Sequence, residues 1–152
     1  MSTSGICNVY VNLTPAEKQF IEEHPLAAWH FWQDAAKAIR EACRRYPTEI
    51  HNGRGDAFRH AYWSALMTKH CGPLLASKFG FAHEAVPPGD GEHSVLVGTR
   101  CLTTQPRPER EMDQYNNAVG RHIALSNLGA QDGQLAEEVE HALKIGQLRC
   151  RP

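Results

Sequence analysis

The sequence predicts an all-α protein, a single-domain orthogonal helical bundle of five to six helices around a buried central helix at about residues 56–71, with a long loop at 87–107. Three observations support this prediction: well-capped helix starts, apolar residues that repeat every three to four positions, and one segment that is apolar on nearly every side. Because 152 residues suffice for one hydrophobic core, residues 1–152 are expected to form a single helical domain.

Two helices are expected before the central one. The first begins at Thr14-Pro15-Ala16-Glu17, where Thr14 is the N-cap and Glu17 completes a capping box, and it ends near residue 24. The second covers about residues 25–46. Apolar residues at helical spacing predict which side of this second helix faces the core: Trp29, Trp32, Ala36, Ile39 and Cys43.

The central helix follows a glycine-rich turn at residues 52–55 and is stopped by Gly72-Pro73. It has no wide polar face, which is typical of a buried helix. Asp56 and His60 lie one turn apart on it, and burying an acid and an imidazole is costly unless they are paired, hydrogen-bonded or ligated. Either Asp56 caps the helix beside a satisfied core histidine, or the two residues are half of a metal or acid–base site completed by other helices.

Four further segments follow the central helix: a helix to about residue 86, the loop at 87–107, and helices at about 108–128 and 132–148. Residues 95–97 within the loop are read as a short extended piece. The helix at 108–128 carries a polar stripe at i, i+4 spacing, made of Glu109, Asp113, Asn117 and Arg121. Gly120 in the same helix costs about 1 kcal/mol relative to alanine, so we expect it to permit the close approach of another helix.

Composition excludes some classes of protein. The formal net charge is −1 and the pI is about 6.7, which argues against a broad nucleic-acid-binding surface. No stretch approaches the roughly 20 apolar residues of a membrane span. The first residues lack the features of a signal peptide, so we expect synthesis in the cytoplasm, with delivery outside the cell by a specialised secretion system remaining open.

The five cysteines contain no C-x-x-C pair and are expected to be buried free thiols. Bridges between Cys43 and Cys71, or between Cys7 and Cys150, are the alternatives in an oxidising compartment.

Polar groups from three segments are positioned to converge in a compact helical domain. Two imidazoles with carboxylates suit zinc, manganese or iron, and the same groups without metal suit general acid–base chemistry. An arginine beside them suits an anionic substrate or a developing oxyanion. The candidate catalytic residues are His60, Glu84, Asp113 and Arg59; the candidate substrate-binding residues are Arg121, Asn117 and Trp63; the candidate metal ligands, for one divalent ion, are Asp56, His60, His83 and Asp113.

Three motifs carry a resemblance to a known family: residues 52–63 (N-G-R-G-D-A-F-R-H-A-Y-W), residues 82–84 (A-H-E), and residues 109–121 (E-R-E-M-D-Q-Y-N-N-A-V-G-R). Together they resemble a bacterial family of small helical domains without an assigned activity, which stand alone or end large wall-associated, toxin-like proteins. The long loop at 87–107 and the pair Gln114-Tyr115 depart from the family pattern. The resemblance implies that these positions are shared by such domains: Asp56, Arg59, His60, His83, Glu84, Glu109, Asp113, Asn117 and Arg121.

The residues and the resemblance together favour a bacterial toxin or effector-type hydrolase that acts on a cell-wall, lipid ester or phosphodiester substrate. A cognate immunity protein or a secretion-system component would be its partner. Two alternatives remain open. One is a small nuclease toxin with a basic groove formed by Arg40, Arg44, Arg45, Arg54 and Arg59. The other is a non-enzymatic helical binding module, such as an immunity or adaptor protein, in which the polar residues form a buried structural network.

Overall fold

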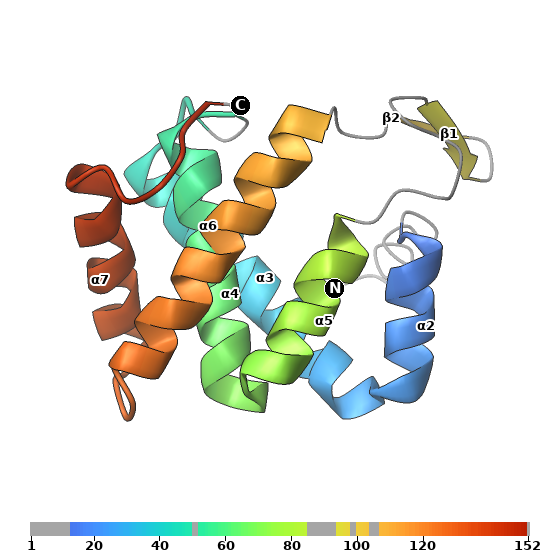
Figure 1. The fold of residues 1–152 in the computed structure, drawn as a ribbon, viewed down its shortest axis with the longest axis horizontal. Helices are drawn as coiled ribbons and strands as arrows, with labels where there is room; N and C mark the ends of the chain where they lie inside the picture. The colour runs from blue at the N-terminus through green and yellow to red at the C-terminus, as the bar shows by residue number, and fades with distance from the viewer. Residues whose placement is uncertain (1–12, 50–51, 85–93, 98–99, 104–106, 152) are drawn as a thin grey trace.

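The computed structural model describes residues 13–49, 52–84, 94–97, 100–103 and 107–151 (Figure 1). The predicted all-α bundle is confirmed, with six helices in these ranges. The helices are α2 (Pro15–Glu23), α3 (Pro25–Arg45), α4 (Arg54–Cys71), α5 (Pro73–His83), α6 (Arg107–Ser126) and α7 (Asp132–Lys144).

The predicted long loop contains a short antiparallel hairpin. Strand β1 (Ser94–Val97) pairs with β2 (Arg100–Thr103), with Ser94 opposite Thr103 and Val97 opposite Arg100. The extended piece expected at residues 95–97 is therefore present as β1, and a second strand accompanies it. Arg107, the last residue of the predicted loop, begins α6, and the rest of this loop lies outside the described residues.

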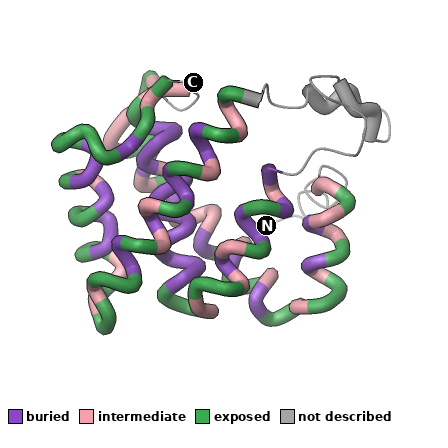
Figure 2. Tube along the Cα trace, viewed as in Figure 1, coloured by how far each residue is buried: buried purple, intermediate pink, exposed green. Residues whose placement is uncertain are grey.

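Helix α4 is the central element, as predicted. It packs against α3, α5, α6 and α7 (Figure 1). From Gly55 to Thr68 every residue except Arg59 is buried, and Figure 2 shows exposed residues mainly on the outer faces of the surrounding helices. The absence of a polar face on α4 in the sequence thus reflects helices on several sides of it.

Helices α4 and α6 approach each other closely at Gly120. A Cβ atom added to Gly120 would lie 2.0 Å from the carbonyl oxygen of Ala61, which is far inside van der Waals contact. The predicted role of Gly120 in helix packing is therefore confirmed. This contact brings the polar stripe of α6 against the polar residues of α4.

The predicted core face of α3 is wrong. Trp29 and Ile39 are exposed, with 61% and 44% of their surface accessible, and Cys43 is also exposed. Small residues let α3 lie close to α4, whereas the indole rings would hold the two helices apart. The buried stripe has the same helical spacing but a different phase: Ala27, Phe31, Asp34, Ala38 and Ala42.

An aromatic cluster joins α2, α3 and α5 to α4. The Phe20 ring lies 5.0 Å from that of Phe79, and the Trp63 ring meets Phe79 edge-on at 5.7 Å. The indole N–H of Trp63 donates to the carbonyl oxygen of Phe31 at 2.9 Å. This packing fixes α5 against α4, and so fixes the residues at the end of α5.

The expectation of buried thiols fails for Cys43, which is an exposed free thiol, while Cys71 and Cys150 are partly buried free thiols. Cys7 and the side chain of Cys101 lie outside what the structure describes. Among the described helices, none combines the length and apolar character needed to cross a membrane.

Candidate functional site

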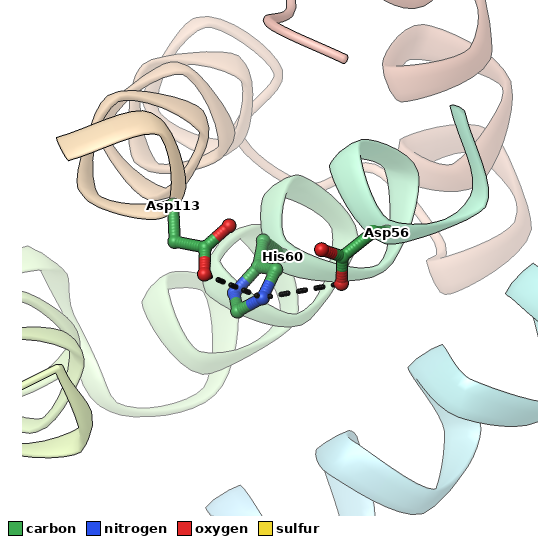
Figure 3. Close-up of side chains that lie close together, drawn as sticks. All are labelled: Asp56, His60 and Asp113. Atoms are coloured by element: carbon green, nitrogen blue, oxygen red, sulfur yellow. Dashed lines mark ion pairs between the residues drawn. The ribbon is translucent and has the colours of Figure 1, made fainter. Parts of the chain in front are cut away.

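One histidine and two aspartates meet where α4 faces α6 (Figure 3). His60 Nε2 lies 3.4 Å from Asp56 Oδ1 and 3.4 Å from Asp113 Oδ2, and all three side chains are at most 1% exposed. Asp56 and His60 are one turn apart on α4, while Asp113 comes from α6. The site therefore depends on the close approach of these two helices.

Asp56 is held by contacts at the start of α4. Its Oδ2 accepts the backbone N–H of Asn52 at 3.0 Å, and its Oδ1 lies 2.5 Å from Nη2 of Arg59. Burial alone would raise the pKa of Asp56, but His60 and Arg59 outweigh it and hold the pKa well below the usual range of an aspartate. Asp56 is therefore a carboxylate at neutral pH.

His60 is a neutral imidazole in this setting, because burial lowers its pKa against the pull of Asp56. Its Nε2 also lies 3.0 Å from Nη2 of Arg59. Its Nδ1 has no hydrogen-bond partner within the described residues and lies 3.9 Å from Glu84 Oε1. A neutral imidazole is the form of histidine that binds a metal ion or accepts a proton.

Glu84 faces His60 from the end of α5. It is 6% exposed, and burial raises the pKa of its carboxyl group to about 7. A carboxyl group with this pKa can give or take a proton near neutral pH, which is the property required of a general acid or base.

His83 forms a second pair with Glu17, a residue that the sequence had indicated only as a helix cap. His83 Nδ1 lies 2.5 Å from Glu17 Oε1, and Glu17 is 3% exposed. Glu17 raises the pKa of His83 against the opposing effect of burial. No sequence signal links the two residues, since they are 66 positions apart and meet only because α2 packs on α5.

Asp56, His60 and Asp113 are the residues that could hold a metal ion. Each offers one ligand atom, and these atoms all lie within 4.8 Å of one another. An imidazole with two carboxylates is a donor set that suits zinc, manganese or iron. His83 lies apart from this group, with its Nδ1 on Glu17. The Arg59 guanidinium supplies the positive charge beside the Asp56 carboxylate. An ion bound here would share Asp56 with Arg59.

The polar stripe of α6 continues away from this group. Glu109 Oε1 accepts from Asn52 Nδ2 at 2.5 Å, and Asn117 is buried. Arg121 is partly buried beside Gly80, where a Cβ would lie 3.9 Å from its Nη1. Burial lowers the pKa of the Arg121 guanidinium, and no carboxylate in the described part of the chain opposes this effect. Arg121 therefore remains available to an anionic group.

The other two predicted positions take structural contacts. Trp63 packs in the core, and its ring meets His83 edge-on at 5.1 Å. Arg59 lies against Asp56 and His60.

The arginines proposed for a basic groove are mostly paired. Arg44 and Arg45 contact Glu41, and Arg45 also contacts Glu137 at 2.5 Å. Arg54 lies 2.9 Å from Glu49, and Arg59 lies on Asp56. Four of the five positive charges are thus offset by nearby carboxylates.

Comparison with known proteins gives one family. The model of a domain of unknown function, DUF6973, matches residues 18–147. Neither the curated proteins nor the solved structures contain a significant match to the chain. The matched range includes every residue of the site except Glu17.

Proposed function

Since this chain belongs to the DUF6973 family, which carries no assigned activity, we propose from its own geometry that it is a hydrolase of bacterial toxin or effector type with a His/carboxylate site. One observation carries the proposal: buried His60 has carboxylates of Asp56 and Asp113 at 3.4 Å from one nitrogen and Glu84 at 3.9 Å from the other. Three acids around one buried imidazole are costly to fold, and such clusters concentrate at functional sites.

The reaction is the cleavage of an ester-type bond by water. A water proton passes to an imidazole of the site as the water oxygen bonds to the acyl carbon or phosphorus. The bond to the leaving oxygen breaks, and that oxygen takes a proton from the Glu84 carboxyl group, which burial keeps partly protonated near neutral pH. A divalent ion, zinc or manganese, held by Asp56, His60 and Asp113, would supply Lewis-acid polarisation of the substrate oxygen or activation of water.

The substrate class is a cell-wall, lipid ester or phosphodiester group. Arg121 supports an anionic substrate, because its guanidinium has no carboxylate partner in the described part of the chain. The pairing of four arginines with carboxylates disfavours the small nuclease, since a nucleic-acid groove needs unpaired positive charge.

The toxin or effector setting rests on the motif resemblance. Under this proposal the protein leaves the producing cell through a specialised secretion system, and the producer carries a cognate immunity protein.

A second candidate is a non-enzymatic binding module with a structural polar network. The contact of Arg59 with both Asp56 and His60 favours it, because a guanidinium between Asp56 Oδ1 and His60 Nε2 balances the buried carboxylate without a ligand.

The two functions separate in a hydrolysis assay. Three proteins are compared: wild type, His60→Gln, and the control His141→Gln, which changes an exposed histidine of α7. Each is incubated with a p-nitrophenyl ester, bis(p-nitrophenyl) phosphate and purified peptidoglycan, with and without zinc or manganese. The hydrolase predicts turnover of at least one probe by wild type and by His141→Gln, and a loss of about 100-fold or more in His60→Gln with the helical circular dichroism retained. Absence of turnover of every probe, or turnover by a folded His60→Gln protein equal to that of wild type, would contradict the proposed hydrolase.

A further inference from the structure

Glu17 has two tasks, and only one concerns its own helix. Its Oε2 accepts the backbone N–H of Thr14 at 2.7 Å, which completes the capping box of α2. Its Oε1 lies 2.5 Å from His83 Nδ1 at the end of α5. Capping-box acids ordinarily sit at a solvated helix start, whereas Glu17 is 3% exposed.

The start of α2 is also tied directly to the end of α5. The Thr14 hydroxyl donates to the carbonyl oxygen of Ala82 at 2.7 Å, one residue before His83. The His83 ring is further held between Trp63, edge-on at 5.1 Å, and Phe79, stacked at 6.5 Å. The position of the imidazole is therefore fixed by three helices, α2, α4 and α5.

The contact with Glu17 determines which nitrogen of His83 is basic. A carboxylate only accepts hydrogen bonds, so in the neutral ring of His83 it is Nδ1 that carries the proton and Nε2 that keeps its lone pair. His83 Nε2 lies 4.0 Å from Glu84 Oε1, too far for a hydrogen bond, so this lone pair is not occupied by Glu84.

Of the two imidazoles His60 and His83, His83 is the one that solvent reaches. Its side chain is 35% exposed, whereas that of His60 is 1% exposed and surrounded by protein groups. A base that removes a proton from an attacking water must be accessible to that water.

From these contacts we propose that His83 is the general base of the site and that Glu17 is the positioning residue that orients it. This inference rests on the proposed hydrolase and assigns a role within it. His83 Nε2 accepts the proton of the attacking water, while Glu84 gives its proton to the leaving oxygen. The imidazolium then returns a proton to the Glu84 carboxylate across the 4.0 Å separation, directly or through water, and both groups are restored.

The test measures the tautomer of His83 and the rate of hydrolysis in the same set of proteins. Glu17→Gln is the key variant, because glutamine still serves at this position of a capping box but can donate as well as accept to His83. Glu22→Gln, an exposed residue of the same helix, is the matched control. Long-range proton–nitrogen NMR correlations of the neutral ring, assigned by comparison with His83→Gln, report the tautomer without substrate.

We expect the Nδ1–H tautomer in wild type and in Glu22→Gln, and loss of this preference in Glu17→Gln. We expect kcat on the hydrolysed probe to fall about 10-fold or more in Glu17→Gln and about 100-fold or more in His83→Gln, with KM little changed and the helical circular dichroism retained. An Nε2–H tautomer in wild type, or a Glu17→Gln protein with unchanged tautomer and kcat, would overturn the role of Glu17.

The failure of this inference is distinct from the failure of the proposed function. Hydrolysis that is lost in His60→Gln but unchanged in His83→Gln would remove His83 as the base and leave the hydrolase standing. Absence of hydrolysis by the wild-type protein would remove both, whatever tautomer His83 adopts.

Discussion

The carbonyl oxygen of Ala61 occupies the space that a side chain at Gly120 would need, 2.0 Å from the position of its Cβ. This contact lies one residue after His60 on α4 and seven residues after Asp113 on α6. The distance between the backbones of α4 and α6 therefore sets the distance between the imidazole and the carboxylate, so packing at Gly120 controls the geometry of the site.

Gly120→Ala should destabilise the protein by about 1–3 kcal/mol, because the added methyl group forces the two helices apart. Gly133→Ala is the matched control: a Cβ at this position of α7 meets nothing within 4 Å, so the higher helix propensity of alanine should leave stability unchanged or raise it by up to about 1 kcal/mol. Urea unfolding followed by circular dichroism measures both values. Equal stability of the two variants would contradict the packing described here.

Zinc or manganese should raise the melting temperature of the wild-type protein. An ion that binds only the folded state adds about 2.7 kcal/mol to the free energy of unfolding at 100 times its dissociation constant. Asp113→Asn weakens a ligand of the Asp56, His60 and Asp113 group, so its thermal shift should be much smaller. The exposed variant Glu138→Gln controls for binding to surface acids. A shift that is the same in all three proteins would place the ion elsewhere.

Arg59→Gln should cost about 3 kcal/mol of stability, because it leaves the buried Asp56 carboxylate without its guanidinium partner. The matched control is Arg54→Gln, which breaks an exposed pair with Glu49 and should cost much less, because solvent screens a surface ion pair. If a divalent ion and Arg59 share Asp56, zinc should stabilise Arg59→Gln more than wild type in thermal denaturation. A smaller zinc effect in Arg59→Gln would show that Arg59 does not compete with the ion.

Glu84 should make stability depend on pH between about 4.5 and 7. Burial raises the pKa of its carboxyl group from 4.5 to about 7 in the folded protein. The stabilisation from this group is full below the unfolded pKa and is lost as pH rises through the folded pKa, and its size is about 3 kcal/mol.

Glu84→Gln removes this titration, so the difference in unfolding free energy between pH 5 and pH 8 should shrink relative to wild type. Denaturant unfolding at both pH values measures the difference, with the exposed Glu138→Gln as the control. An unchanged pH dependence in Glu84→Gln would mean that its carboxyl group titrates normally in the folded state.

Much of this fold follows from the sequence because local patterns determine it. The lack of a polar face predicted the burial of α4, and the glycine in the middle of α6 predicted a close helix contact. The i, i+4 spacing of Asp113 and Asn117 placed them on one face, and both are buried there. In these cases a single helix carries the whole signal.

The errors arise where the partner of a residue is not encoded locally. On α3, apolar residues lie on two sides, so periodicity gave the spacing of the core stripe but not its phase, and Trp29 was assigned to the core although it is exposed. Glu17 was identified only as a cap, because its contact with His83 exists only after α2 has packed on α5. The hairpin of β1 and β2 likewise depends on pairing between two short segments.

Helix α4 supplies both the middle of the hydrophobic core and two members of the polar group, Asp56 and His60. Selection for thermal tolerance and selection for activity therefore act on the same eighteen residues. A directed-evolution library aimed at a more durable protein should leave α4 unchanged and vary the exposed faces of α3 and α7, where substitutions alter solubility and helix propensity without moving the imidazole of His60.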